Sequence, residues 1–364
     1  MDSLKYPYFA NMKKMLILAC ICLVFGCKDR AKTIESDAQA IEFKYITKIR
    51  MTDDGESIRI HSGGEVTRFS KEELPLNSAM VIPTSVIAYL DELDLTDKIT
   101  GISQPAHTYN PAIRKLYKNN QIQEIGTFNE IFIEKVLVSK PEIFVSMSSP
   151  ALAKFHEILK SNGISVIYID EYEELNPLAK AEYVKIFGIL FGKEREAENL
   201  FQEIEENYKT IQAMTAQLSG QKPTVMANQI YGDIWYMPGG KSFQALLFRD
   251  AGGDYLWADT TQEGTLHLSF ESVYEKAKDA DVWMNAGDFP NLNALKGSYN
   301  NYDWFEAVRN QKVYNWNQRI TASGGNDYFE KGVTRPDWVL KDLAAIFYPQ
   351  SFPEHELYFY KRLK

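Results

Sequence analysis

Short apolar runs alternate with amphipathic helical runs along most of the chain, and the alternation occurs in two blocks. The apolar runs that resemble strands are SAMVIP (78–83), KITGIS (98–103), EIFVSM (142–147), SVIYID (165–170), TVMANQI (224–230), DIWYMPG (233–239), DVWMNAG (281–287) and KVYNWN (312–317). Strands that are apolar on both faces and separated by helices favour parallel sheets covered by helices on each side. The chain is therefore predicted to be an α/β protein with two lobes.

Helical text separates the two blocks. Asn176-Pro177 supplies a cap and a proline at a helix start. Apolar residues recur at three- and four-residue spacings between about Lys193 and Leu218, which predicts one long helix. That helix is either a strut between the lobes or another helix covering a sheet. In the first block, Thr84 or Ser85 is the expected cap of a helix over 84–95.

An acid, a helix and a strand appear in the same order twice. FIEKVLVSKPEIFVSM (132–147) contains Glu134, and FESVYEKAKDADVWMN (270–285) contains Glu271 in the matching place. Each copy falls at the same stage of its own block. The repeat therefore supports two lobes of similar design.

The amino terminus has the pattern of an export signal. Lys13 and Lys14 precede an apolar run from Met15 to about Phe25, which is too short to span a bilayer but suits a secretory signal. LVFGC, ending at Cys27, resembles a bacterial lipobox, so Cys27 is predicted to carry lipid; a plain signal peptide is the alternative. All three cysteines lie in this segment, which leaves the mature chain without a disulfide.

The predicted domains follow from these patterns. They are a signal peptide (1–26), a lipidated tether (27–40), a small β-rich segment (41–75), an N-terminal α/β lobe (76–176), a helical linker (177–221) and a C-terminal α/β lobe (222–364). The β-rich segment is predicted from its alternating polar and apolar residues and its glycines.

Composition and motifs exclude several functions. The net charge of −9, with no cluster of Lys and Arg, does not suit nucleic acid. The five histidines form no close pair, and neither a GxSxG nor a GxxxxGK[ST] motif is present. No catalytic residue, metal ligand or cofactor is predicted; only His107 and His267 fall in loops where they could face a ligand.

Several segments together resemble a known family. VIPTSVIAYLDELDLTDKITGIS, NPLAKAEYVKIFGILFGKEREAENLF, WYMPGGKSFQALLFRDAGGDYLW and RPDWVLKDLAAIFYP are similar to iron–siderophore and cobalamin substrate-binding proteins of ABC importers, above all to lipid-anchored members from Bacteroides-like bacteria. The likeness covers about Ser78 to Leu363. It implies two Rossmann-like lobes joined by one long helix, with the ligand held between them. It also implies that Glu134 and Glu271 dock on the permease; the alternative is that each merely favours a helix N-terminus.

Ligands of open α/β sheets bind beyond the carboxyl ends of the strands. That rule selects the predicted ligand-binding residues Ser85, Tyr109, Ser146, Tyr172, Trp235, Tyr236, Asn285, Phe289, Trp316 and Arg319. The aromatic members suit a bulky organic ligand, although each taken singly also fits a core position. Gly239 and Gly240 either bind an anion or form an ordinary strand-to-helix junction capped by Ser242.

The sequence thus predicts a lipid-anchored binding protein that captures a ferric siderophore, haem or cobalamin. Its expected partners are an ABC permease with its ATPase and, through the lipid alone, a membrane; a monomer is expected. The expected location is the envelope of a Gram-negative bacterium, facing the periplasm. A surface lipoprotein serving an outer-membrane channel is the main alternative, and a tetrapyrrole metal chelatase is less favoured.

Overall fold

The structure is a computed structural model that describes residues 38–128 and 130–364. By packing, the chain divides after Gln39, and Ala40–Lys364 form one unit. The predicted signal peptide, Cys27 and its lipid lie outside the described residues. Among the helices of the described residues, none has both the length and the apolar character needed to cross a membrane.

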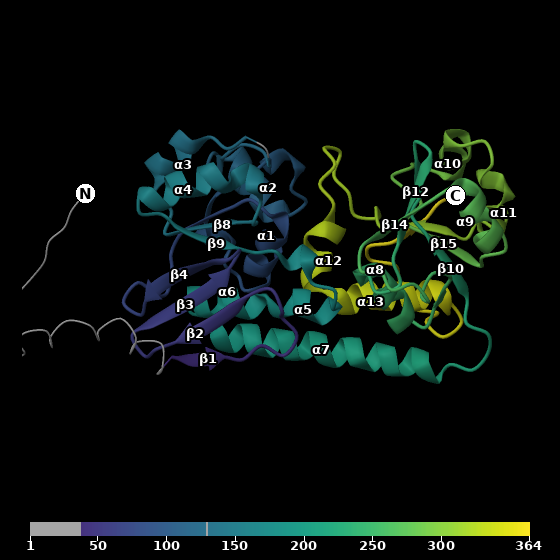
Figure 1. The fold of residues 1–364 in the computed structure, drawn as a ribbon, viewed down its shortest axis with the longest axis horizontal. Coiled ribbons are helices and arrows are strands. Elements are labelled where there is room, and N and C mark those ends of the chain that lie inside the picture. The colour runs from purple at the N-terminus through teal and green to yellow at the C-terminus, as the bar shows by residue number, and fades with distance from the viewer. Residues whose placement is uncertain (1–37, 129) are drawn as a thin grey trace, which may run out of the picture. The chain divides into compact units, whose positions relative to one another are not determined.

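The N-terminal lobe is built on a five-stranded parallel sheet in the order β7-β6-β5-β8-β9 (Figure 1). Its strands are β5 (Ala79–Val81), β6 (Ile99–Ile102), β7 (Gln123–Glu124), β8 (Ile143–Ser146) and β9 (Ser165–Tyr168), and its helices are α1 (Thr84–Glu92), α2 (Pro111–Lys118), α3 (Ile133–Ser139) and α4 (Ala153–Ser161). Strands β5 and β8 are fully buried, as the continuous apolar runs predict.

The C-terminal lobe repeats this design with a second five-stranded sheet, in the order β13-β10-β15-β16-β17. Only the last strand of this sheet is antiparallel. A separate antiparallel sheet, β11-β12-β14, stands beside it. The strands are β10 (Thr224–Ala227), β11 (Ile230–Tyr231), β12 (Ile234–Pro238), β13 (Asp254–Tyr255), β14 (Thr265–Leu268), β15 (Val282–Met284), β16 (Val313–Asn315) and β17 (Lys361–Arg362). The helices are α8 (Phe243–Asp250), α9 (Phe270–Ala277), α10 (Leu292–Ser298), α11 (Glu306–Arg309), α12 (Lys331–Thr334) and α13 (Pro336–Phe347).

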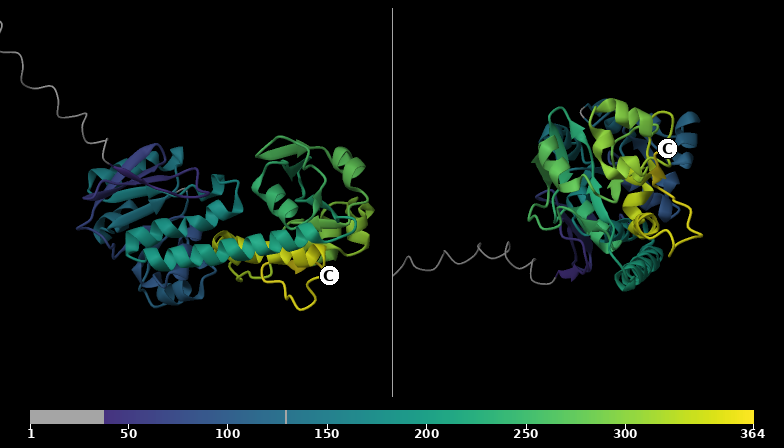
Figure 2. Two further views of the ribbon diagram at one scale, coloured as in Figure 1. Left: turned by 90° about the horizontal axis from the view of Figure 1, so that it is seen from below. Right: turned by 90° about the vertical axis from the view of Figure 1, so that its right-hand side faces the viewer.

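Three helices join the lobes: α5 (Pro177–Glu182), α6 (Val184–Phe191) and α7 (Glu194–Gln217). Helix α7 runs along both lobes in Figure 1 and in the left view of Figure 2, and it packs on α6 and α13. Near its start, Phe201 meets Tyr45 at a ring separation of 6.1 Å. Farther on, the Tyr208 hydroxyl donates to Asp250 Oδ2 of the C-terminal lobe at 2.9 Å. Of the two alternatives for the long helix, the strut between the lobes is therefore the correct one.

A small antiparallel sheet precedes the first lobe. Its strands are β1 (Gln39–Ile41), β2 (Arg50–Asp53), β3 (Ser57–Ser62) and β4 (Glu65–Ser70). Strands β2, β3 and β4 pair in register, with a tight turn at Gly63-Gly64. Strands β3 and β4 pack on β9, and the Thr67 hydroxyl donates to the Val166 carbonyl at 2.6 Å. The sheet is thus an extension of the N-terminal lobe.

The fold confirms the predicted class, two Rossmann-like α/β lobes joined by a long helix with a small N-terminal β segment. The sequence patterns did not predict the short strands β7, β13, β14 and β17, nor the helices α2, α10, α11 and α12. The expected cap of α1 is also wrong. Pro83 occupies the cap position, and the Ser85 hydroxyl donates to Glu171 instead. The exact domain boundaries stay a prediction.

Candidate functional site

The two lobes meet directly through a segment of the C-terminal lobe that reaches the loop before α2. Glu330 accepts the backbone N–H of Tyr109 on Oε1 at 2.6 Å and that of Asn110 on Oε2 at 2.9 Å. Ser323 Oγ donates to the carbonyl of Ala106. Burial raises the pKa of Glu330 to about 7, although the two backbone N–H groups favour its charged form. We call this set of contacts the lobe latch.

A glycine makes the close approach at the lobe latch feasible. A Cβ added at Gly325 would lie 2.6 Å from the backbone oxygen of His107 and 2.7 Å from Thr108 C, both on the opposite lobe. Such a contact leaves no room for a side chain. The SGGND turn is therefore part of the packing between lobes.

A pocket of 370 Å³ adjoins the lobe latch. It is lined by residues of both lobes, namely Tyr109, Gln318, Arg319, Ile320, Glu356, Leu357 and Tyr358. The Arg319 guanidinium lies between two aromatic rings, 5.1 Å from the centre of Tyr109 and 4.2 Å from that of Tyr358. Its Nε donates to Asp327 Oδ2 at 2.6 Å. A flat or anionic ligand would meet two tyrosine rings and the remaining N–H groups of Arg319 here.

A second group of side chains lies where α5 passes between the lobes; we call it the α5 cluster (Ser85, Glu171, Lys180 and Phe243). Ser85 Oγ donates to Glu171 Oε1 at 2.5 Å, while Glu171 Oε2 is buried and has no hydrogen-bond partner among the described residues. Burial raises the pKa of Glu171. The Lys180 ammonium lies 4.0 Å from the ring centre of Phe243, and burial lowers its pKa.

Two of the predicted aromatics are exposed. Tyr172, in the 3₁₀ turn after β9, is 54% exposed. Tyr236 is 37% exposed and meets His267 edge to face, with ring centres 5.2 Å apart. Tyr172 lies in the N-terminal lobe, and Tyr236 lies in the β11-β12-β14 sheet, on the side of the C-terminal lobe nearer the N-terminal lobe (Figure 1). These two residues are thus accessible to a ligand.

Other predicted residues are half-buried or buried. Phe289 packs against the core, and Trp316 stacks on Tyr328 with ring centres 5.0 Å apart. Asn285 is buried in a left-handed conformation, and its Oδ1 has no partner among the described residues. None of these three side chains lines the pocket beside Arg319.

Trp235 and Ser146 are corrections to the predicted list. The Trp235 ring is 0% exposed, donates its indole N–H to the carbonyl of Ala227 at 2.9 Å and packs against Trp283. Ser146 is fully buried, and its hydroxyl lies 2.8 Å from His156 Nε2. Both side chains belong to the core: alternation along β12 turns Trp235 inward, whereas every residue of β8 is buried.

The glycine-rich turn before α8 is an ordinary strand-to-helix junction. The N–H of Gly239 donates to the Gly264 carbonyl at 2.8 Å, and that of Gly240 donates to Thr260 Oγ1 at 2.8 Å. Ser242 caps α8 by accepting the Ala245 N–H at 3.3 Å. Since the chain already uses these N–H groups, the anion-binding alternative is not supported.

Glu134 and Glu271 lie apart from the pocket beside Arg319. Each is exposed and stands in the first turn of its helix, α3 or α9. Both helices lie on the side of the two lobes away from α7 (Figure 1).

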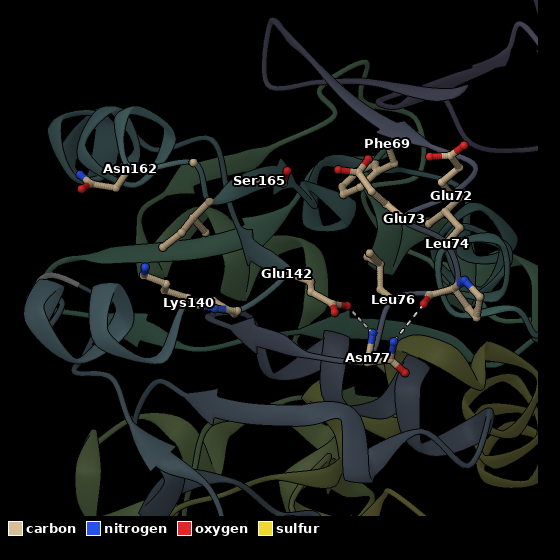
Figure 3. A pocket seen from close by; sticks show the side chains of 14 residues that line it. Phe69, Glu72, Glu73, Leu74, Leu76, Asn77, Lys140, Glu142, Asn162 and Ser165 are labelled. Carbon is tan, nitrogen blue, oxygen red and sulfur yellow. Dashed lines mark hydrogen bonds between the residues drawn. The ribbon is translucent and has the colours of Figure 1, made fainter. Parts of the chain in front are cut away.

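A larger pocket, of 670 Å³, lies at the other end of the N-terminal lobe, where β5, β8 and β9 begin. Figure 3 shows its side chains: Glu142 Oε2 accepts the Asn77 N–H at 2.5 Å, with Glu72, Glu73 and Lys140 around it. None of the predicted site residues lines it. We therefore place the candidate site at the lobe junction.

Sequence reasoning missed three residues of that junction. Lys180 lies in helical text that gives no sign of a functional residue, and Tyr358 comes from the last residues of the chain. Glu330 joins the lobes although it is 221 residues from Tyr109. Only the strand-end rule pointed to this region, through Tyr109 and Arg319. Within the described residues no group of three or more His, Cys, Asp or Glu side chains could hold a metal ion.

Several known proteins are similar to this chain in sequence or in fold. An uncharacterised lipoprotein of Methanocaldococcus jannaschii is 26% identical over 302 residues, which span 80% of this chain and 70% of the relative. A possible iron-binding (periplasmic solute-binding) protein from Staphylococcus epidermidis aligns with a TM-score of 0.60 at 18% identity, over 75% of this chain and 99% of that one. The siderophore-binding protein BauB, bound to two molecules of acinetobactin and ferric iron, aligns with a TM-score of 0.60 at 17% identity, over 80% and 99% of the two chains.

The two solved structures establish the fold alone, because their identity to this chain is low. The family model described as periplasmic binding protein matches residues 81–320, which contain the strands of both main sheets from β6 to β16. That match extends over more than half of the sequence. The chain belongs to the periplasmic binding protein family.

Proposed function

We propose that the protein is the substrate-binding component of an ABC importer and binds a bulky metal chelate between its lobes. The observation that carries the proposal is the pocket to which both lobes contribute, with Arg319 held between Tyr109 and Tyr358. A pocket shared by two lobes lets bound ligand change how the lobes are held, which a permease can recognise.

The proposed ligand is a ferric siderophore, haem or cobalamin. Aromatic rings and one guanidinium suit the large, partly apolar and often anionic surface of such complexes. The exposed Tyr172, Tyr236 and His267 add aromatic surface on the two lobes. The fold shared with the siderophore-bound BauB supports this ligand class.

A binding screen tests this proposal directly. Residues 28–364 are purified, and their melting temperature is measured with ferric siderophores, haem and cobalamins. A ligand at a hundredfold excess over its Kd stabilises the folded protein by about 2.7 kcal/mol, which the melting temperature detects. Arg319→Ala should weaken binding of the ligand that is found, whereas Lys193→Ala, at the start of α7 and outside the pocket lining, should not. Binding by none of the three classes rejects the proposal.

Docking through Glu134 and Glu271 is a second part of the proposal. Two exposed carboxylates, one per lobe, would pair with arginines of the permease and report on both lobes together. The double variant Glu134→Arg/Glu271→Arg should lose uptake in cells while its ligand affinity stays unchanged. Normal uptake by this variant would contradict the docking role.

The proposed anchor is a lipid on Cys27, with the protein facing the periplasm of a Gram-negative envelope and delivering ligand to the permease and its ATPase. The lipoprotein relative supports this assignment. Labelling cells with a radioactive fatty acid should mark the wild-type chain and leave Cys27→Ser unlabelled. Protease treatment of intact cells separates a periplasmic from a surface-exposed protein.

A further inference from the structure

One lysine between the lobes forms no ion pair with the described residues. Lys180 comes from α5, and its ammonium lies over Phe243, the first residue of α8 in the C-terminal lobe, at 4.0 Å from the ring centre. Helices α5 and α8 pack on each other (Figure 1). Burial lowers the pKa of Lys180, and the charges of Glu171 and Glu174 in the N-terminal lobe partly oppose that effect. The ammonium is therefore held between side chains of both lobes.

Other cations at the lobe junction are already neutralised. Their ion pairs are Arg319–Asp327 at 2.6 Å, Lys331–Glu92 at 3.1 Å and Arg335–Asp337 at 2.7 Å. Lys180 differs from them, since no carboxylate oxygen in the described part of the chain lies within 4.0 Å of its Nζ. A half-buried ammonium without an ion pair is costly unless something else compensates it.

Glu171, the nearest acid in the α5 cluster, is a poor counter-charge. The side chain is 6% exposed, and its Oε1 is occupied by the Ser85 hydroxyl. Its Oε2 is buried and has no partner among the described residues. Burial raises the pKa of Glu171, so its carboxyl gives up its proton less readily than an exposed one. Two polar groups of the α5 cluster, Glu171 Oε2 and the Lys180 ammonium, thus have no hydrogen-bond or ion-pair partner among the described residues.

We infer that Lys180 recognises a negatively charged oxygen of the ligand, so that the site between the lobes selects anionic chelates over neutral ones. The inference rests on the proposed function and specifies the charge of its ligand. The unpaired Oε2 of Glu171 provides a second hydrogen-bonding position beside Lys180. Because the cluster contains residues of both lobes and of the linker, a ligand bound there contacts all three.

The test compares two iron complexes that differ in net charge, an anionic ferric tris-catecholate and a neutral ferric trihydroxamate. Their Kd values are measured by quenching of tryptophan fluorescence in wild type, Lys180→Gln and Lys193→Gln. Lys193 is the matched control, since its ammonium is on the surface, 3.2 Å from Glu196. We expect Lys180→Gln to weaken the anionic complex by about tenfold or more and to change the neutral one by less than about threefold. Lys193→Gln should change neither.

Each outcome separates the inference from the proposed function. If Lys180→Gln weakens both complexes equally, or leaves the anionic one unchanged, the inference is wrong while a binding protein remains. A wild type that prefers the neutral complex has the same consequence. A wild type that binds no ferric chelate, haem or cobalamin overturns both. Lys180→Met, which keeps the apolar stem, replaces Lys180→Gln if circular dichroism shows that the latter fails to fold.

Discussion

Glu182 holds the segment before β2 against the linker helices, and its removal should cost more stability than any surface change. The side chain is 0% exposed. It accepts three successive backbone N–H groups, from Lys44 at 2.8 Å, Tyr45 at 2.7 Å and Ile46 at 3.1 Å. In Glu182→Ala these three part-buried donors lose their carboxylate partner.

The expected loss follows from the energy of hydrogen bonds to a charged group. Each is worth about 1.5–3 kcal/mol, and because the three share one carboxylate their sum is less than additive, so about 4 kcal/mol is expected. With about 2 cal/mol/K of unfolding entropy per residue, this lowers the Tm of the unit Ala40–Lys364 by about 6 °C.

Differential scanning calorimetry of residues 28–364 measures that shift. Glu198→Ala is the matched control, because the Glu198 side chain is 60% exposed and, among the described residues, forms an ion pair only with Lys185, at 2.9 Å. The control should change Tm by less than about 1 °C. If Glu182→Ala shifts Tm no more than the control does, the three N–H groups do not depend on this carboxylate and the reasoning fails.

Four further predictions concern pH, the lobe latch and motion. Burial lowers the pKa of His156 to about 4, so on acidification the unfolded chain protonates this imidazole before the folded chain does. The free energy of unfolding should therefore fall by up to about 3 kcal/mol as pH drops from 6.5 to 4. His156→Gln should flatten that part of a curve of Tm against pH. Burial raises the pKa of Glu330 to about 7, so as pH rises from 4.5 through 7 the unfolded chain loses this proton first and the free energy of unfolding falls, in the opposite direction to the effect of His156. A wild-type curve of Tm against pH that runs parallel to that of Glu330→Gln would contradict this. Glu330→Ala should also speed proteolysis at residues 318–330, because the lobe latch loses both N–H bonds to the loop before α2. The distance between spin labels at Val138→Cys and Lys296→Cys should change by less than about 3 Å on ligand binding, because α7 and the lobe latch join the lobes rigidly. A larger shift in the measured distance distribution would refute a rigid linker.

Periodicity predicted the parts of the fold that depend on local sequence. The long helix expected between about Lys193 and Leu218 spans Glu194–Gln217, since its apolar stripe is fixed by residues three and four apart. Strand β17 was missed because two residues at the end of the chain carry no pattern, and only their pairing with β16 makes them a strand.

The site was predictable to the extent that strand ends determine it. Tyr109 and Arg319, selected by that rule, lie on one pocket. The prediction that Trp235 binds ligand was wrong because adjacent residues on a strand face opposite sides. Ile234 and Tyr236 of β12 are exposed, so Trp235 between them points inward. Alternation alone would have separated Tyr236 from Trp235. Lys180 and Tyr358 needed coordinates, because contacts between distant segments bring them to the junction.

The buried groups with shifted pKa values also bear on whether this junction binds or catalyses. His156 is engaged by Ser146 inside the core, and Glu330 is engaged by two backbone N–H groups of the opposite lobe. Each of these groups is thus held by a contact that maintains the fold, and moving its proton would disturb that contact. Lys180 is different, since its ammonium is held between the lobes without an ion pair in the described residues. Burial lowers the pKa of Lys180, so an anion bound beside its ammonium would stabilise the charged form that burial disfavours.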